Sequence, residues 1–311
     1  MIFLRVDQAG PVTSIQDIGR FGAQRFGLGP AGALDRLSLA IANTLAGNSP
    51  GGAAVEVGPF PARFTALGGP VTLALAGGER EITVNEQRFA LNHTIPLVDG
   101  DTLTLGASRT GVFTYLALAS GIRGEAIFGS LSVHARAGLG SPLPRPLRAG
   151  DLLELNSPST APLRRLPPPQ ETTGPIRVIL GPQDDYFTAE TIGLFLATAW
   201  RISSASDRMA YRLDGPRLGH ARGHNIISDG VANGHIQVPG SGEPLVLLAD
   251  RGTTGGYPKI ACIATIDLGR FAQHRAGSAV RFEDITVEVA QTEARKFAAR
   301  IAALPTEMRS E

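Results

Sequence analysis

The sequence predicts a mainly β protein, built from barrels or sandwiches rather than from a doubly wound α/β sheet. Short segments in which apolar and polar residues alternate recur along the chain, while helical periodicity is rare. Glycine (38 residues) and proline (22 residues) exceed their average usage, and aromatic residues make up only 6%. This composition favours many short elements joined by turns, in a chain of 311 residues that is long enough for one or two domains.

The predicted strands are bounded by Gly, Pro, Asp or Asn, as strand ends usually are. They are ARFTAL (62–67), VTLALAG (71–77), EITVNE (81–86), TLTLG (102–106), DLLEL (151–155), IRVILG (176–181), HIQVPG (235–240), LVLLAD (245–250) and ITVEVA (285–290). Three segments repeat an acidic turn before an alternating strand, at 98–106, 148–155 and 282–290. We interpret this repeat as a weak indication of two related β-rich halves, because hairpins in general use the same turn residues.

Three segments have helical spacing. Residues 34–48 place Leu34, Leu37, Ile41 and Leu45 on one face, and Gly47-Asn48 can end that helix. Residues 187–200 group Ile192, Phe195, Leu196, Ala199 and Trp200 after a Thr188 cap. Residues 292–304 form an amphipathic helix with Phe297, Ile301 and Leu304 inward and Lys296 in solvent.

A proline-rich, polar stretch, SPSTAPLRRLPPPQETTGP (157–175), is the clearest linker. The sequence therefore predicts a β-rich N-terminal domain at 1–160 and a second β-rich domain at 173–291. The remaining residues, 292–311, are predicted as a C-terminal helix and tail.

The net charge of +1 gives no electrostatic footprint for nucleic acid or an anionic membrane, so neither is expected as a partner. The single cysteine, Cys262, excludes an intrachain disulfide and fits a reducing compartment. No apolar run suits a signal peptide at the start or a membrane span elsewhere. We therefore expect a cytoplasmic protein.

Several short patterns fail on their context. GLGPAG (27–32) matches a dinucleotide-binding fingerprint by letter but follows no strand and contains a proline, so a loop entering the next helix is the better interpretation. GTTGGYPK (252–259) is no phosphate-binding loop, because Pro258 precedes the lysine and Ile260 follows it.

The histidines and the cysteine are also best explained structurally. His220 and His224 in HARGH would suit a metal only on a helix, which Gly219 and Gly223 disfavour. Cys262 lies in an apolar run and is expected to be buried rather than reactive. No recognised serine-nucleophile motif is present.

Three polar clusters follow apolar elements, where a rigid scaffold can present side chains to a cleft. They are TSIQDIGRFG (13–22), SSASDRMAYRLDGP (203–216) and ADRGTTGGYPK (249–259). The simpler interpretation of the adjacent pairs Asp207–Arg208 and Asp250–Arg251 is that they are surface or structural ion pairs.

Lys259 in DRGTTGGYPKIA is one of only two lysines among 29 lysines and arginines; the other is Lys296. Where arginine has taken nearly every basic position, a retained lysine indicates a need for a compact ammonium group. We expect Lys259 to begin the strand KIACIATI and to belong to a functional site.

Three ordered segments carry a family resemblance that spans roughly residues 10–290. QDIGRFG with GLGPAGALD and ANTLAGN, then SDRMAYRLDGP, then IQVPGSGEPLVLLADRGTTGGYPKIA, resemble the biotin-dependent carboxyltransferase family, in its second allophanate-hydrolase-type subunit. That group includes the C-type subunit of prokaryotic 5-oxoprolinase and a module of urea carboxylase. The chain departs from the family pattern at Ala210, His235 and Gly252, so the resemblance does not fix the substrate in detail.

The resemblance implies a cyclophilin-like β-barrel, assigned to residues 173–291, and a second β-rich half. It implies a heteromeric 5-oxoprolinase, in which this chain would work with the B-type subunit (the first allophanate-hydrolase-type subunit) and with the A-type subunit. That enzyme uses ATP, with Mg²⁺, to open 5-oxoproline to L-glutamate. Biotin is not expected on this chain, and no metal site is assigned to it.

Within this hypothesis, ATP-driven activation places negative charge on a lactam oxygen and on phosphoryl oxygens, and pre-placed cations would stabilise it. The predicted catalytic residues are Lys259, Asp207 and Arg208. The predicted substrate-binding residues are Asp35, Gln237, Thr253, Thr254, Gly255, Gly256 and Tyr257. Asp207 or Asp35 would orient the substrate or hold Mg²⁺, and the GTTGG backbone amides would line an anion pocket.

Two alternatives remain open at this stage. One is carboxyl transfer from carboxybiotin to a urea-like amide, for which this chain offers no biotinylation segment and would need other proteins. The other is a non-catalytic regulatory binding module, since a fold does not fix a function.

Overall fold

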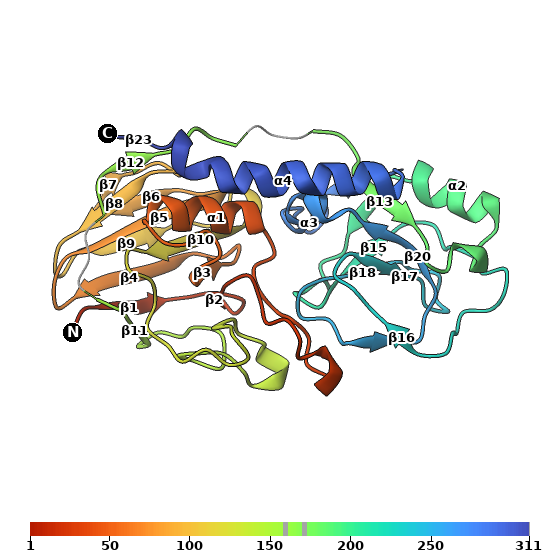
Figure 1. Ribbon diagram of the computed structural model, residues 1–311, viewed down its shortest axis with the longest axis horizontal. Coiled ribbons are helices and arrows are strands. Elements are labelled where there is room, and N and C mark those ends of the chain that lie inside the picture. The colour runs from red at the N-terminus through yellow and green to blue at the C-terminus, as the bar shows by residue number, and fades with distance from the viewer. Residues whose placement is uncertain (158–160, 170–172, 311) are drawn as a thin grey trace. The chain divides into compact units, whose positions relative to one another are not determined.

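A computed structural model describes residues 1–157, 161–169 and 173–310 (Figure 1). The chain forms two compact units: unit 1 comprises residues 1–22, 31–170 and 299–311, and unit 2 comprises residues 23–30 and 171–298. The predicted linker falls in part on residues 158–160 and 170–172, which lie outside the described residues.

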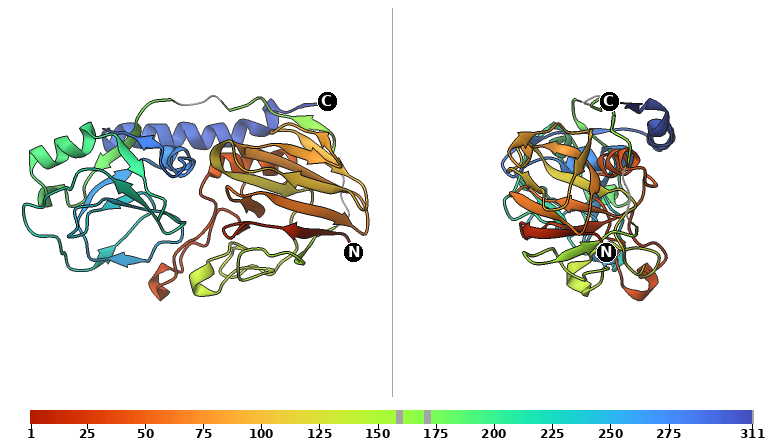
Figure 2. Two further views of the ribbon diagram at one scale, coloured as in Figure 1. Left: turned by 180° about the vertical axis from the view of Figure 1, so that it is seen from behind. Right: turned by 90° about the vertical axis from the view of Figure 1, so that its left-hand side faces the viewer.

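Unit 1 contains two larger sheets, seen from two further directions in Figure 2. The six-stranded sheet has the order β11 (Leu152–Glu154), β1 (Phe3–Gln8), β4 (Ala62–Leu67), β9 (Thr102–Leu105), β6 (Ile82–Val84) and β7 (Gln87–Arg88). The five-stranded sheet has the order β2 (Ser14–Gln16), β3 (Ala54–Val57), β10 (Thr110–Leu118), β5 (Val71–Glu79) and β8 (Thr94–Leu97). Two further strands, β12 (Arg164–Arg165) and β23 (Arg309–Ser310), pair with each other.

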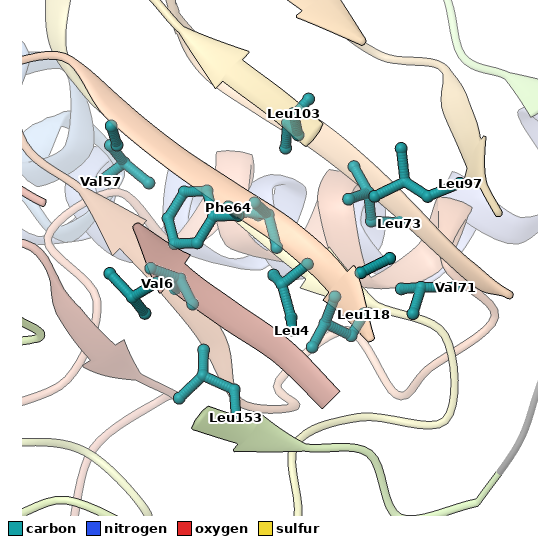
Figure 3. Packing of buried hydrophobic residues seen from close by; sticks show 14 of the residues in the cluster. Leu4, Val6, Val57, Phe64, Val71, Leu73, Leu97, Leu103, Leu118 and Leu153 are labelled. Atoms are coloured by element: carbon teal, nitrogen blue, oxygen red, sulfur yellow. The ribbon is translucent and has the colours of Figure 1, made fainter. Parts of the chain in front are cut away.

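Both sheets of unit 1 contribute to one apolar core, as in a sandwich (Figure 3). Leu4 and Phe64 come from the six-stranded sheet, and Leu73 and Leu118 from the five-stranded sheet; all four are fully buried. Removing this apolar area from water is the main stabilising contribution to the unit.

The opposite face of the five-stranded sheet is covered by helix α1 (Arg36–Leu45), which packs on β5 and β10. In β5, which begins VTLALAG, the leucines face the apolar core. Ala74 and Ala76 alternate with them on the other face of the strand and are small enough for α1 to approach the sheet. Both faces of this strand are therefore buried. The helix begins at the N-cap Asp35 and is followed by Gly47 with φ 79°, in agreement with the predicted limits.

Unit 2 is built on an eight-stranded sheet. Its order is β21 (Ala279–Val280), β14 (Trp200–Ile202), β15 (Ala210–Asp214), β18 (Leu245–Leu247), β17 (His235–Gln237), β20 (Lys259–Ile263), β13 (Ile176–Leu180) and β22 (Phe282–Asp284). The two edge strands, β21 and β22, are separated in sequence only by Arg281, so the sheet curls until its edges nearly meet. This is the nearly closed barrel that the resemblance implies.

The remaining elements of the described chain are short, apart from one helix. They are the strands β16 (Asp229–Gly230) and β19 (Thr254–Gly255), the helices α2 (Ala189–Ala197), α3 (Leu268–Ala272) and α4 (Val287–Glu307), and the 3₁₀ turns η1 (Gln24–Phe26), η2 (Ala135–Ala137), η3 (Asp184–Tyr186) and η4 (Thr265–Asp267). The predicted class, mainly β with few helices, is confirmed. None of the helices in the described part of the chain has the length and apolar character needed to cross a membrane.

The strand predicted at 285–290 is wrong, because α4 begins at Val287. Thr286 accepts a hydrogen bond from Val289 N through its side chain, and Glu288 adds a negative charge to the first helical turn. The apolar residues that suggested a strand, Val287 and Val289, are both nearly half exposed. The segment forms a helix after a threonine cap in spite of this alternation. The third copy of the acidic-turn repeat, at 282–290, therefore does not lead into the predicted strand.

The predicted helical face at 187–200 is only partly correct. Thr188 caps α2 as expected, but α2 ends at Ala197 and Trp200 lies on β14. Within α2 only Phe195 is buried, and Trp200 reaches it by donating from Nε1 to the Phe195 carbonyl at 2.9 Å. The C-terminal helix is confirmed and is longer than predicted, with Leu304 buried and Lys296 exposed beside Glu293.

Candidate functional site

A β-bulge decides which way Lys259 points. The antiparallel ladder between β17 and β20 pairs His235 with Cys262 and Ile236 with Ala261, but Gln237 with Lys259. Ile260 is therefore an extra residue on β20. In an unbroken strand Lys259 would share the face of Ala261, which belongs to the apolar interior. The bulge moves Lys259 to the opposite face, with Gln237, His235 and Cys262.

Lys259 is a completely buried cation with one carboxylate partner given by the structure. Its side chain is 0% exposed, and its Nζ lies 2.9 Å from Oδ2 of Asp229, whose side chain is 55% exposed. The hydrogen bond from Lys259 is the main reason that the pKa of Asp229 is lowered. The pair thus joins a buried ammonium to a carboxylate that solvent and small molecules can reach.

Asp229 is carried by a short ribbon formed by β16 and β19. Asp229 pairs with Gly255 and Gly230 with Thr254 in this ladder, and Ile226 N donates to the Gly256 carbonyl at 2.9 Å. The predicted segment 253–257 is therefore fixed beside the carboxylate.

Gln237 and Gly255 fit together closely. Gln237 is nearly buried and donates from Nε2 to the Tyr257 carbonyl at 3.3 Å. A Cβ added at Gly255 would collide with that same Nε2 atom. A side chain at position 255 would thus displace Gln237, so the glycine is required here for close approach and not for its backbone angle.

Gln183 contacts Lys259 through its backbone and its side chain. Its N–H donates to the Lys259 carbonyl at 3.1 Å, and its Oε1 accepts from Lys259 N at 3.2 Å. Its side chain also contributes to the lowered pKa of Asp229, after the larger effects of Lys259 and Gly230.

The groups around Lys259 on this face are kept electrically neutral. Burial, and after it the charges of Lys259 and Arg251, lowers the pKa of His235 to about 4. Burial also raises the pKa of the Cys262 thiol to about 11, which disfavours the reactive thiolate, although the residue is only partly buried and not fully buried as expected. Desolvation dominates both shifts; the neighbouring cations add to it at His235, whereas Arg251 partly opposes it at Cys262.

Asp207 and Arg208 lie just before β15 and have local partners. Arg208 forms a two-point ion pair with Asp250, with Nε to Oδ2 at 3.0 Å and Nη2 to Oδ1 at 3.1 Å. Both side chains are about nine-tenths buried. Oδ1 of Asp207 accepts from the backbone of Met209 and Ala210 and closes a turn. Arg208 thus anchors the base of the segment that continues to Lys259, and its assignment as catalytic remains a prediction.

Asp35 belongs to unit 1, whereas every other predicted site residue belongs to unit 2. Its Oδ1 accepts from Leu37 N and Ser38 N at 3.1 Å, so the carboxylate caps α1. The backbone N–H of Asp35 donates to the Tyr115 hydroxyl, which itself donates to the buried Glu56 at 2.6 Å. This buried chain holds the start of the helix, and a role of Asp35 in substrate binding remains a prediction.

The first polar cluster, at 13–22, is also structural within unit 1. Asp17 accepts hydrogen bonds from Gly19 N, Leu131 N and the hydroxyls of Ser130 and Ser132. These contacts join two loops that are more than a hundred residues apart in the sequence.

Within the GTTGG segment, Thr254 and Gly255 form strand β19 in the ladder with β16, and Gly252, Gly255 and Gly256 have no left-handed backbone angles. The segment thus positions Asp229, which pairs with Gly255. An anion pocket lined by its backbone amides stays a prediction.

The surroundings of His220 and the distribution of possible metal ligands are also visible in the structure. His220 contacts the Val238 carbonyl at 2.9 Å and packs against Phe187, as a structural histidine does. Among residues 1–157, 161–169 and 173–310 there is no group of three or more His, Cys, Asp or Glu side chains that could hold a metal ion.

Sequence reasoning missed Asp229 and Gln183. Asp229 lies in HNIISDGVANGH, which has no strand periodicity, and Gln183 lies in a turn after β13. Neither position has a local pattern that indicates a site. Only the ladder between β16 and β19 and the end of β20 bring them to Lys259.

Comparison with known proteins identifies the family to which this chain belongs. Residues 26–284 match the model of the family described as "Carboxyltransferase domain, subdomain A and B". The chain therefore belongs to the carboxyltransferase domain family.

Individual relatives are more specific. The C subunit of 5-oxoprolinase from Escherichia coli is 34% identical over 290 residues, which cover 92% of this chain and 93% of that protein. The C subunit of 5-oxoprolinase from Haemophilus influenzae is 31% identical over 91% of both chains. The crystal structure of Kluyveromyces lactis urea carboxylase is similar with a TM-score of 0.89 at 28% identity, over 97% of this chain but 29% of that chain.

Proposed function

We propose that this chain is the C-type subunit of an ATP-dependent 5-oxoprolinase, which opens 5-oxoproline to L-glutamate together with A-type and B-type subunits. Two relatives that match almost end to end are named as the C subunit of 5-oxoprolinase, and 5-oxoprolinase is a hydrolase. The chain would then be active only within the complex. With one cysteine in 311 residues, it suits the reducing conditions of the cytoplasm.

The observation that carries this proposal is the pair formed by Lys259 and Asp229. A lactam carbonyl gains negative charge on oxygen when it is activated, and an ammonium group already fixed in a desolvated position stabilises that charge without reorganising. Lys259 is fully buried, and the partly exposed Asp229 marks the point at which its ammonium group approaches solvent.

The electrostatics around the pair support different roles for its two members. The lowered pKa of Asp229 keeps it ionised near neutral pH, so it serves as a counter-ion that orients Lys259 and is a poor proton acceptor. His235 and Cys262, the neighbours of Lys259 on the β17–β20 face, are both neutral at this pH and do not compete with Asp229 for the ammonium group.

ATP enters the proposal as a co-substrate of the complex, with Mg²⁺ bound to its phosphates. The described residues offer no cluster of three metal ligands, and Asp35 and Asp207 use their carboxylates in a helix cap and a turn. We therefore assign to this chain the polarisation of the lactam and not the binding of the metal. No biotin is assigned to it.

Reconstitution tests the proposal. The purified chain is combined with A-type and B-type subunits, and ATP hydrolysis is measured with and without 5-oxoproline. We expect 5-oxoproline to stimulate hydrolysis, and Lys259→Met to abolish the stimulation. Lys296→Met is the matched control, because Lys296 is the other lysine and its side chain is 70% exposed. If the complex binds neither nucleotide nor 5-oxoproline, a regulatory binding module becomes the better interpretation.

Carboxyl transfer to a urea-like amide is the second candidate. The structural similarity to urea carboxylase favours it, and the chemistry is related because both reactions polarise an amide carbonyl. This activity would require carboxybiotin supplied by another protein. Incubation with carboxybiotin and urea distinguishes the two: carboxylated urea, with no response to 5-oxoproline, would replace the first proposal.

A further inference from the structure

Gln183 interacts with the candidate site in three ways. Its backbone N–H donates to the Lys259 carbonyl at 3.1 Å, and its side-chain Oε1 accepts from Lys259 N at 3.2 Å. Its side chain also contributes to the lowered pKa of Asp229, after the larger effects of Lys259 and Gly230. One residue thus holds the backbone of the buried lysine and affects the carboxylate that its ammonium group meets.

The side chain of Gln183 does not cap the turn in which it lies. It occupies the N-cap position of η3, where a side chain commonly accepts a hydrogen bond from the turn that follows, yet its side chain forms no such bond. The turn is closed by the backbone instead, since the Gln183 carbonyl accepts from Tyr186 N at 3.1 Å. The side chain can point towards β20 because its capping role is not used.

The bulge on β20 explains why such a contact is needed. Ile260 is the extra residue in the ladder with β17, and on the other side its carbonyl accepts from Gly181 N at 2.9 Å. A bulge disturbs the regular ladder, so the next residue loses part of its normal alignment. Gln183 supplies two hydrogen bonds to the backbone of Lys259. They act directly beside the bulge that turns the Lys259 side chain to the other face of the strand.

We propose that Gln183 is a positioning residue that holds Lys259 and Asp229 in their mutual geometry for the reaction, an inference that rests on the proposed function. It acts on Lys259 through the backbone and on Asp229 through the carboxylate, and it needs no contact with the substrate. Displacing a catalytic group by about 1 Å can cost on the order of a hundredfold in rate. Loss of Gln183 should therefore lower kcat more than it raises KM.

Two variants separate its two contacts. Gln183→Met keeps the length of the side chain and removes its hydrogen bond to Lys259 N together with the amide that affects Asp229. Gln183→Glu keeps an acceptor for Lys259 N but, when ionised, puts a negative charge in place of the amide, which also raises the pKa of Asp229. Gln8→Ala, at the exposed end of β1 in unit 1, is the control for a glutamine lost elsewhere.

The first measurements use the chain alone, so they do not depend on the identity of the reaction. Carbon-13 NMR titration should give a higher pKa for the Asp229 carboxyl group in both Gln183 variants than in the wild type. Amide hydrogen exchange at Lys259 should accelerate in Gln183→Met and stay closer to wild type in Gln183→Glu. An unchanged pKa of Asp229 together with unchanged exchange at Lys259 would overturn the proposal, whatever the complex does.

The second measurement uses the reconstituted complex. We expect Gln183→Met to lower kcat by about tenfold to a hundredfold with little change in KM, and to shift the acid limb of the pH–rate profile to higher pH. A loss of activity that simply follows a lower thermal midpoint, with an unchanged pH profile, would indicate a merely structural role. If the wild-type complex does not respond to 5-oxoproline, the proposed function fails while the NMR and exchange results still decide the role of Gln183.

Discussion

The ammonium group of Lys259 lies 2.9 Å from the carboxylate of Asp229, and the two residues differ sharply in environment. The lysine is fully buried on a strand of the barrel, whereas the aspartate is more than half exposed on a two-stranded ribbon. The two residues are 30 positions apart in the sequence. The fold places the buried ammonium group of Lys259 directly beside the exposed carboxylate of Asp229.

Replacement of Lys259 by arginine tests whether a compact ammonium group is required. A guanidinium is larger and planar, and a completely buried position offers it neither space nor matching acceptors. We expect Lys259→Arg to lose at least about a hundredfold in 5-oxoproline-dependent ATP hydrolysis, the same direction as the loss expected for Lys259→Met. Near-wild-type turnover in Lys259→Arg would contradict this, because charge alone would then be sufficient.

The ion pair of Arg208 and Asp250 should dominate stability at the base of the site segment. Removing one partner leaves a buried, uncompensated charge, so Arg208→Met should lower the free energy of unfolding by about 3 kcal/mol. The double variant Arg208→Met/Asp250→Leu should recover most of this loss, as measured by urea denaturation. If the double variant is stable and fully active, Arg208 has no catalytic role and the prediction that it does is wrong.

A comparison of two neighbouring glycines tests the packing around Gln237. Gly255→Ala would drive its Cβ into the Gln237 amide and break the bond to the Tyr257 carbonyl, at a cost of about 1 kcal/mol or more. At Gly256 the nearest atoms to an added Cβ are 3.7 Å away, so Gly256→Ala should be neutral or slightly stabilising. Thermal unfolding of both variants and a crystal structure of Gly255→Ala would check this. Equal effects at the two positions would show that the collision is relieved without moving Gln237.

The low pKa of His235 makes a specific prediction for acid stability. The folded chain keeps this imidazole neutral down to a pH of about 4, whereas the unfolded chain takes up a proton near pH 6.5. The unfolded state therefore binds more protons between these values, and His235 lowers the free energy of unfolding as the pH falls from 6.5 towards 4.

His235→Gln removes this proton uptake. We expect the wild type to lose more stability than the variant between about pH 7.5 and about pH 5, as measured by denaturant titration at each pH. The activity of the variant should keep the wild-type pH profile across this range, because His235 does not change charge in the folded protein there. Identical losses of stability in both proteins would mean that the folded and unfolded chains protonate His235 over the same pH range, so that folding does not lower its pKa.

Local sequence patterns predicted much of the fold. Alternation located β4, β5 and β9, and the spacing of Leu37, Ile41 and Leu45 located α1. These elements form because one face of each is apolar with the correct period, which is a property of neighbouring residues. The pattern at 285–290 was misleading because Val287 and Val289 are exposed on a helix, and their alternation reflects no buried face.

The sequence by itself determined the mainly β class and the family to which the chain belongs, and it led to the prediction that Lys259 belongs to a site. Only the tertiary structure decided where that lysine points. An alternating strand places Lys259 with Ala261 and Ile263 in the interior, and the single extra residue Ile260 transfers it to the opposite face. The partners Asp229 and Gln183 arrive from a ribbon and a turn without local periodicity. Their positions depend on pairing between distant segments, and no short window of sequence contains that information.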